Sequence, residues 1–224
     1  MTNVKAGGKR KRVSKPQEER LTDLLDASAV IFARDGVADA KIEDITAQAS
    51  VSKGTFYLYF KSKDEAAAAV WRRYIDEFIS VGEAILADDW VPASTRLVRI
   101  FESLLRFTFS NADLHRNLYL AAGSEVVKSA ANQRLIELIG RTAQQGVDSG
   151  ELECDQPELA ASILYHGLCG ATLDALRMRP PKADALIKAG GRLAHTIFAK
   201  SKAVGAATAT KTSGRRSAAR ASTR

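Results

Sequence analysis

Apolar residues recur every three or four positions through most of this 224-residue chain, and no stretch of useful length alternates apolar and polar residues as a β-strand does. Pro16 suits the first turn of a helix, and Gly36 suits the position after the last turn, where positive φ is needed. The pattern predicts an all-α fold of about nine helices. Serines at 62 and 94 are the expected caps of two of them. The expected helices cover residues 16–36, 42–49, 52–60, 62–86, 94–109, 114–122, 125–148, 157–178 and 183–200.

Residues 42–60 predict two short helices joined by a tight turn. Ile42 and Ile45 place apolar side chains on one face of the first helix. Ser52 suits the N-cap of the second, because its hydroxyl can accept a hydrogen bond from a free backbone N–H of the first turn. This is the layout of a helix-turn-helix, whose second helix offers its N-terminal residues to the major groove of DNA. The apolar anchors of the second helix would be Val51, Phe56 and Phe60.

Residues 24–70 carry the run LLDASAVIFARDGVADAKIEDITAQASVSKGTFYLYFKSKDEAAAAV. This run resembles the N-terminal DNA-binding domain of TetR/AcrR-family transcriptional regulators, in the apolar helix ending at Gly36, in VSKGTFYLYF and in the KSKDE that follows. Elsewhere the chain resembles the family only in length and helical pattern. The resemblance implies a ligand-responsive transcriptional regulator, with a repressor favoured, that binds a palindromic double-stranded DNA operator as a homodimer.

The resemblance also implies DNA contacts on and around the second helix. Lys53 is the best candidate to contact a base edge, because lysine can donate to O6 and N7 of guanine. Gly54 allows close approach of the backbone, and Tyr57 can hydrogen-bond a phosphate or contact a thymine methyl group. The full expected set is Lys41, Ser52, Lys53, Gly54, Thr55, Tyr57, Leu58, Tyr59, Lys61 and Lys63.

Three residues depart from the family pattern. Ser50 stands where the turn commonly has glycine, so a serine would adopt positive φ at some cost in strain. Lys41 and Glu43 stand where threonines and an arginine are common. Glu43 should be repelled by phosphate unless it accepts from cytosine N4 or pairs with a neighbour. These departures affect the operator sequence and leave the class of function unchanged.

The chain divides into four expected segments: a basic disordered arm (1–15), a helix-turn-helix DNA-binding domain (16–63), a ligand-binding and dimerisation domain (64–200) and a basic disordered tail (201–224). The resemblance implies that the last two long helices form a four-helix interface between two copies. Small residues on the first of these helices would permit close packing. The expected interface residues are Gly167, Gly170, Ala171, Ala175, Leu193 and Ile197.

The resemblance places a small-molecule pocket among the middle helices. Its expected lining is mainly apolar, which favours a hydrophobic or amphipathic effector. Aromatic residues at helical spacing are more often ordinary core, so that alternative stays open for each of them. The candidates are Trp71, Phe78, Phe101, Leu105, Phe109, His115, Tyr119, Tyr165, His166 and Cys169.

The sequence gives little evidence for an enzyme active site or a metal site. His166 and Cys169 lie three positions apart and could hold a metal or act as a redox switch, but no second ligand pair is present. A buried histidine and a buried thiol are the simpler expectation. The chain has no Gly-rich phosphate loop and no nucleophile elbow. We therefore expect no enzyme activity, no cofactor and no metal.

The charge is concentrated at the two ends of the chain. Residues 1–15 contain six lysines or arginines and residues 200–224 contain seven, and neither segment contains an acid. Since the whole chain has a net charge of +7, residues 16–199 carry about −6. The tails could be phosphate clamps, and an architectural protein that binds DNA with weak sequence preference is the alternative function. Two cysteines and no apolar run near the ~18 residues of a membrane span favour a cytoplasmic, nucleoid-associated protein that contacts no membrane.

Overall fold

The computed structural model describes residues 16–121, 125–178 and 181–198, and these residues form nine helices and no strand, which confirms the predicted all-α class. The two basic tails lie outside the described residues. The helices are α1 (Gln17–Asp39), α2 (Ile42–Gln48), α3 (Lys53–Tyr59), α4 (Lys63–Leu86), α5 (Ala93–Ser110), α6 (Ala112–Leu120), α7 (Glu125–Asp148), α8 (Pro157–Arg177) and α9 (Ala183–Phe198).

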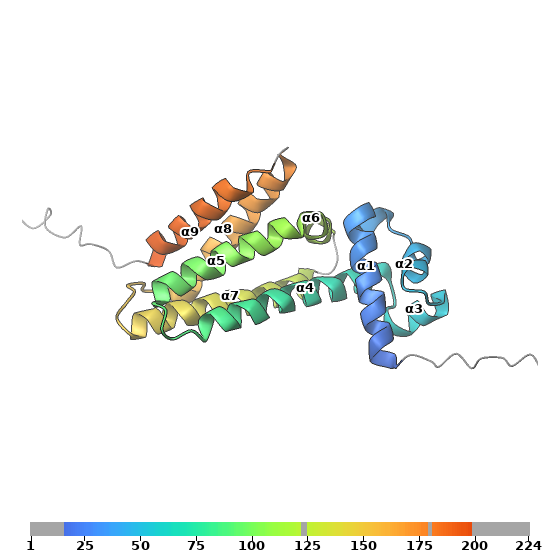
Figure 1. The fold of residues 1–224 in the computed structure, drawn as a ribbon, viewed down its shortest axis with the longest axis horizontal. Helices are drawn as coiled ribbons and strands as arrows, with labels where there is room; N and C mark the ends of the chain where they lie inside the picture. Colours follow the sequence, from blue (N-terminus) through green and yellow to red (C-terminus); the bar gives the residue numbers. More distant parts are fainter. Residues whose placement is uncertain (1–15, 122–124, 179–180, 199–224) are drawn as a thin grey trace, which may run out of the picture.

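Helices α1, α2 and α3 lie together at one end of the molecule, and α4 leads from them into a larger group of helices (Figure 1). In that group α4 packs against α7, α5 against α9, and α8 against both α7 and α9. The short helix α6 packs against α1. Both α4 and α6 therefore connect the end that carries the predicted helix-turn-helix to the rest of the protein.

The α5 helix shows how the hydrophobic pattern builds the core. Leu97, Ile100 and Phe101 recur at helical spacing and are completely buried. Burying such side chains stabilises the fold by about 1.5–3 kcal/mol each. The α9 helix approaches α5 closely at two glycines: a Cβ on Gly190 would lie 2.7 Å from Leu105, and a Cβ on Gly191 would lie 2.9 Å from Glu102.

The observed helices match the predicted ones closely, with three corrections. Ser94 does not cap α5, which begins at Ala93, and the Ala93 N–H donates to the Glu151 carboxylate at 2.6 Å. The α6 helix begins at Ala112 rather than 114, so the predicted turn before it is shorter. Gly36 adopts the predicted positive φ (79°), but its ψ of 163° interrupts α1, and the chain makes one more helical turn to Asp39.

The predicted Ser62 cap forms at the start of α4, and Glu65 adds a second bond as in a capping box, but to residue 61. The Ser62 hydroxyl accepts from the Glu65 N–H at 3.1 Å, as predicted. The Glu65 carboxylate accepts from the Lys61 N–H at 2.6 Å. Two backbone N–H groups at this helix start are thus satisfied, which fixes where α3 ends and α4 begins.

Candidate nucleic-acid interface

The turn between α2 and α3 has the predicted helix-turn-helix geometry. The Ala49 N–H donates to the Ile45 carbonyl at 2.9 Å, and the Val51 N–H donates to the Thr46 carbonyl at 3.0 Å. Ser50 adopts φ 54°, the only positive φ among the described non-glycine residues. This left-handed conformation costs an L-residue about 1–2 kcal/mol. Tertiary packing of the two helices has to offset that strain.

The N-terminus of α3 is held by its own cap. The Ser52 hydroxyl accepts from the Thr55 N–H at 3.1 Å, which confirms the predicted N-cap. The Ser52 and Thr55 hydroxyl oxygens also lie 2.9 Å apart in a hydrogen bond. Such a cap contributes roughly 1 kcal/mol. Both hydroxyls are engaged with each other in the free protein, so a DNA phosphate has to replace or share these bonds.

The α3 helix divides into an inner and an outer face. Phe56 is completely buried, Phe60 is 4% exposed, and their rings contact each other at 5.5 Å between centroids. Tyr57 and Leu58 are 50% and 80% exposed. Beside them, a Cβ on Gly54 would meet only the Ser52 hydroxyl, at 3.7 Å. The outer face is therefore open to a partner. It includes the large apolar side chain of Leu58, whose exposure to water is unfavourable unless a partner covers it.

Lys53 forms an ion pair with Glu43 of α2, with 2.5 Å between Nζ and Oε1. Both side chains are more than half exposed. The hydrogen bond from Lys53 holds the pKa of Glu43 below its usual range, and the same bond raises the pKa of Lys53. An exposed pair of this kind is weakened by salt and holds its partners loosely. Lys53 can therefore exchange Glu43 for a base or phosphate.

Tyr59 and Lys63 are turned toward the protein, unlike the outward residues of the predicted set. The Tyr59 hydroxyl donates to the Gln17 carbonyl at the start of α1 at 3.0 Å. Lys63 Nζ donates to the carbonyls of Ala38 and Ala40 at 2.5 and 2.9 Å, where it satisfies acceptors at the end of α1. The structure thus gives both side chains a role in fixing α1 against α3 and α4. Of the other predicted lysines, Lys41 and Lys61 are exposed.

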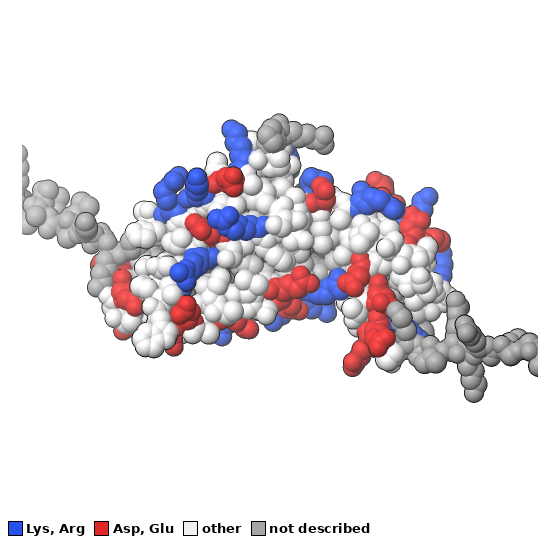
Figure 2. Space-filling view, viewed as in Figure 1, with Lys and Arg blue, Asp and Glu red and all other residues white. Residues whose placement is uncertain are grey.

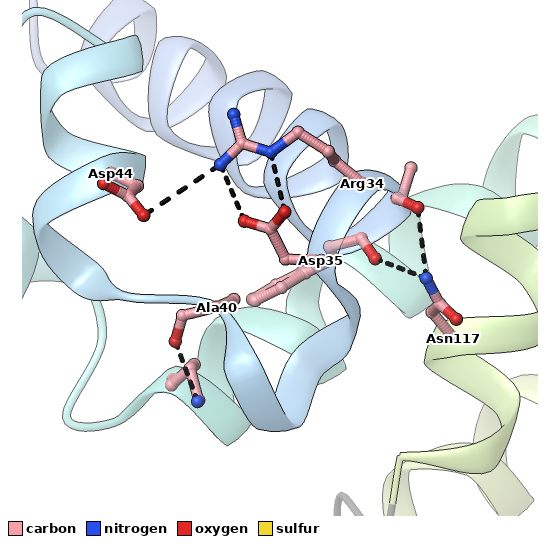
Figure 3. A network of polar contacts seen from close by, with 8 residues as sticks. Arg34, Asp35, Ala40, Asp44 and Asn117 are labelled. Atoms are coloured by element: carbon pink, nitrogen blue, oxygen red, sulfur yellow. Dashed lines mark hydrogen bonds and ion pairs between the residues drawn. The ribbon is translucent and has the colours of Figure 1, made fainter.

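A polar network joins α1 to α2 and to α6 (Figure 3). The Arg34 guanidinium donates to both Asp35 carboxylate oxygens at 2.7 Å, and it lies 4.0 Å from Asp44. The Asn117 amide on α6 donates to the carbonyls of residues 32 and 33 at 2.8 and 3.1 Å. Asn117 is therefore a direct connection between the helix-turn-helix end and the larger group of helices.

The surface around this interface is mixed in charge. Basic and acidic side chains are interspersed at the α2–α3 end, and acidic side chains follow the face of α1 (Figure 2). The acids of α1 include Glu18 and Glu19 in its first turn. Long-range attraction to phosphate therefore has little source in this part of the described surface. The segment that is rich in lysine and arginine, residues 1–15, precedes α1 and lies outside the described residues.

Most of the predicted effector-pocket residues lie in the interior of the larger group of helices. Trp71, Phe78, Phe101, Leu105, His115, Tyr165 and Cys169 are buried, and Phe109 and Tyr119 are partly buried. His166 is the exception. It is exposed on α8, so the prediction of a buried histidine there was wrong. Residue 166 follows the buried Tyr165 in the sequence, but it lies on the side of α8 that does not pack against α7 or α9.

Aromatic rings from α4, α5 and α6 form one cluster in this interior. Trp71 stacks on Tyr74 at 5.4 Å between ring centroids, His115 stacks on Tyr119 at 5.7 Å, and Trp71 and His115 are 5.6 Å apart. Tyr74 and Phe107, 4.7 Å apart, belong to the cluster and were absent from the predicted pocket. Tertiary packing, which the sequence pattern does not specify, places Tyr74 beside His115.

The buried titratable groups in and around this cluster are neutral at neutral pH. Burial lowers the pKa of His115 to about 4, and burial raises the pKa of Cys169 to about 11. Burial raises the pKa of Tyr165 well above its usual range, and its hydroxyl donates to the Asn132 amide oxygen at 3.1 Å. A protonated thiol is a poor nucleophile and a poor metal ligand. Both cysteines are free, and the described residues contain no group of three His, Cys, Asp or Glu side chains suited to a metal.

Four of the six predicted dimer residues are exposed on α8 and α9, whereas Ile197 packs against the core. Gly167 and Gly170 would place a Cβ in open space, Ala171 is exposed, and Leu193 is 47% exposed. Ala175 is 6% exposed and packs within its own chain, so it is not on the exposed face. Two further apolar side chains are exposed on α8 and were missed in the sequence: Leu159 at 53% and Ile163 at 63%.

The α8 helix is also long and apolar enough to cross a membrane by length and composition, contrary to the expectation from the sequence, with 39% of its most apolar window buried. Interior helices of globular proteins pass the same test. Since α8 packs against α7 and α9, its apolar character is explained by packing on one face and by the exposed apolar residues on the other.

Comparison with known proteins identifies relatives of both the sequence and the fold. Residues 24–70 match the family described as bacterial regulatory proteins, tetR family. The HTH-type transcriptional activator FasR of Mycolicibacterium smegmatis is 28% identical over 216 residues, which is 88% of this chain and 93% of that protein. The HTH-type transcriptional repressor DhaR of a Mycobacterium species (strain GP1) is 26% identical, over 67% of this chain and 79% of that protein.

Two solved structures show the similarity of fold. SmeT, described as the repressor of a multidrug efflux pump of Stenotrophomonas maltophilia, superposes with a TM-score of 0.68 at 21% identity, covering 81% of this chain and 91% of that one. FadR of Bacillus subtilis, solved in complex with stearoyl-CoA, superposes with a TM-score of 0.65 at 20% identity, covering 79% and 98%. The overall fold is thus shared with two proteins that are only 20% and 21% identical in sequence.

Proposed function

Since the chain belongs to the TetR family of bacterial regulatory proteins, we propose that it is a dimeric repressor of transcription that binds a palindromic operator and is released from it by a small apolar or amphipathic molecule. Its place of action would be the cytoplasm, on DNA. The domain division is part of the proposal: residues 16–63 bind DNA, and residues 64–200 bind the effector and a second copy of the chain. The two basic tails would strengthen binding to DNA of any sequence.

The outer face of α3 is the observation that carries the proposal. Gly54, Tyr57 and Leu58 are exposed on a short helix whose opposite side is anchored by the completely buried Phe56. A capped, rigidly anchored helix that presents a glycine and a large exposed apolar side chain suits insertion into a major groove. We propose that Lys53, Gly54, Tyr57 and Leu58 contact bases, and that Lys41, Ser52, Thr55 and Lys61 contact phosphates.

A two-fold dimer is supported by the exposed apolar face of α8 and α9. Leu159, Ile163 and Leu193 are about half exposed or more, with Gly167 and Gly170 between them. Glycines on such a face let two helices approach closely. A two-fold axis through this face would set two α3 helices about one DNA turn apart, ~34 Å, which requires a palindromic operator.

The dimer can be tested with substitutions that leave the protomer intact. Gly167→Leu and Gly170→Leu place side chains where a Cβ meets nothing in the protomer, and leucine favours a helix more than glycine does. The double variant should therefore remain folded and sediment as a monomer, while Ala84→Leu, at an exposed position of α4, should remain a dimer. A double variant that still sediments as a dimer would move the interface elsewhere.

The operator can be found by in vitro selection of genomic DNA fragments on the purified full-length chain at near-physiological salt. Recovery of a palindrome is the expected result, and the genes beside it would identify the regulated process. The architectural alternative predicts no enriched motif and binding that is lost steeply as salt rises. Removal of residues 1–15 should weaken binding to all sequences alike and flatten the salt dependence under either outcome.

A further inference from the structure

Two polar atoms in the aromatic cluster have no hydrogen-bond partner among the described residues: Trp71 Nε1 and His115 Nε2. Trp71 is 2% exposed and His115 is 6% exposed, so water does not satisfy them from the surface. Buried polar groups in native proteins are rarely left without a partner, and such exceptions require an explanation. Both rings belong to one cluster and contact each other, with 5.6 Å between their centroids, so a single small group beside their edges could serve both.

The bonding around the two rings fixes what each atom can do. The Tyr74 hydroxyl donates to the Thr108 hydroxyl at 3.5 Å, and it also lies 3.2 Å from His115 Nδ1. We assign the single Tyr74 proton to the bond with Thr108, so that at His115 Tyr74 accepts from Nδ1–H. The neutral imidazole then carries no proton on Nε2, which is an acceptor, whereas the indole Nε1–H of Trp71 is only a donor. The unsatisfied pair is therefore one donor and one acceptor.

The charge of the surroundings narrows the choice of ligand further. Burial lowers the pKa of His115 to about 4, so its ring is neutral at neutral pH. The described contacts of Trp71 and His115 are with aromatic rings and the Tyr74 hydroxyl, and none is with a lysine or arginine. A carboxylate or phosphate here would be a buried charge without a counter-ion, and it could only accept hydrogen bonds.

We propose that Trp71 and His115 bind the head group of the effector, and that this head group is a neutral one that both accepts and donates a hydrogen bond, such as a hydroxyl or a primary carboxamide on an apolar body. The inference rests on the proposed function, because it assigns the chemistry of the effector site. The head group accepts from Trp71 Nε1–H and donates to His115 Nε2. The remainder of the ligand would lie among the apolar side chains around the cluster.

The position of this site on α6 connects it to DNA binding. His115 lies two residues before Asn117, whose amide holds the carbonyls of residues 32 and 33 on α1 (Figure 3). A ligand that shifts His115 along with α6 would shift Asn117 as well. The bonds from Asn117 would then be the first contacts with the helix-turn-helix end to change.

The two tryptophans of the chain allow a direct test. Trp90 is 97% exposed in the segment between α4 and α5, so Trp90→Phe leaves Trp71 as the sole tryptophan at little structural cost. The probes are 1-decanol, decanamide and decanoate, each titrated into the Trp90→Phe dimer at pH 7.5 with Trp71 emission recorded. The proposal predicts saturable changes with decanol and decanamide, and at least tenfold weaker binding of decanoate. Equal binding of decanoate, or no change with any probe, would overturn it.

A variant of His115 supplies the second arm. His115→Phe keeps a planar ring and removes both nitrogens, and Phe198→Leu is the control for a general change in the core, since Phe198 is buried on α9 outside the ring cluster. His115→Phe should weaken decanol binding at least tenfold, while Phe198→Leu should change decanol binding less than threefold. Unchanged decanol affinity in His115→Phe would overturn the assignment. A wild-type chain that binds decanol but no operator would instead remove the proposed function and leave the head-group site standing.

Discussion

The outer face of α3 and the aromatic cluster around His115 are built by opposite means. On α3 the polar bonds are local and exposed: Ser52 caps Thr55 three residues away, and Lys53 pairs with Glu43 ten residues away. In the cluster the polar bond is distant and buried: His115 pairs with Tyr74, which is 41 residues away on another helix. A surface that exchanges its partners for DNA benefits from weak, salt-screened bonds. An interior site discriminates between ligands by their hydrogen-bonding groups, because a buried polar group that is left without a partner is costly.

Buried and exposed residues also lie side by side within α3, and their substitution should give the largest difference in the free energy of unfolding. Phe56→Ala removes a completely buried ring and should lower the free energy of unfolding by about 3–5 kcal/mol. Leu58→Ala, at a side chain that is 80% exposed, should change it by no more than about 0.5 kcal/mol. Urea denaturation followed by circular dichroism measures both. A similar loss for both variants would mean that Leu58 is covered in solution.

The interior site should differ from the surface in its response to pH. Burial lowers the pKa of His115 to about 4, below the ~6.5 of the unfolded chain, so the unfolded state binds the extra proton between these two values. The contribution of the neutral ring is complete above pH 6.5 and is lost as the pH falls toward 4, to a total of about 3 kcal/mol. The measurement is the free energy of unfolding of the wild type minus that of His115→Phe at several pH values. A difference that does not change between pH 7 and pH 4 would contradict a buried neutral histidine.

Tyr57 tests the surface side of the comparison, where the expected effect lies on DNA binding alone. Tyr57→Ala should weaken binding to the selected operator by ~1–3 kcal/mol with no change in the fold. Tyr57→Phe separates a hydroxyl bond to phosphate from contact of the ring with a thymine methyl group. Fluorescence anisotropy with labelled operator gives the affinities. Trp90→Ala, in the loop between α4 and α5, serves as the control, and an affinity unchanged in Tyr57→Ala would remove Tyr57 from the interface.

The smallest effect is expected at the exposed ion pair. Glu43→Gln removes a negative charge near the expected phosphate path and releases Lys53 for DNA. Operator affinity should rise at low salt, by less than the loss caused by Tyr57→Ala, and the dependence on salt should steepen by about one ion. Glu137→Gln, an exposed acid on α7, is the matched control. Weaker binding in Glu43→Gln would indicate that the carboxylate contacts a base, as with cytosine N4.

Features that depend on nearby residues could be predicted from the sequence, whereas contacts between distant residues could not. The N-cap at Ser52, the positive φ at Ser50 and the anchor Phe56 were all predictable, because each depends on residues within a few positions. The bond from Tyr59 to Gln17 spans 42 residues and could not be predicted. Helical spacing identifies which residues share a face, but it does not say which neighbouring helix that face meets.

The larger group of helices shows the same limit. We expected His166 to be buried and Ala175 to lie on the dimer face. Instead His166 is exposed and Ala175 is buried within the protomer, because α7 and α9 pack against a different side of α8. The hydrogen bond between Tyr74 and His115 requires α4 and α6 to pack with these two residues facing each other. That packing depends on the loops between the helices, whose geometry cannot be predicted from the spacing of apolar residues. The apolar pattern predicted that individual residues of this interior would be buried, but it did not predict the polar contacts among them.

The central claim is that a dimer places two α3 helices in successive major grooves. Hydroxyl-radical footprinting and guanine methylation interference on the selected operator test it most directly. We expect two interference patches related by the palindrome, with centres about one helical turn (~34 Å) apart, which disappear in Gly167→Leu/Gly170→Leu. Uniform protection along the fragment, without patches and unchanged in that variant, would contradict it.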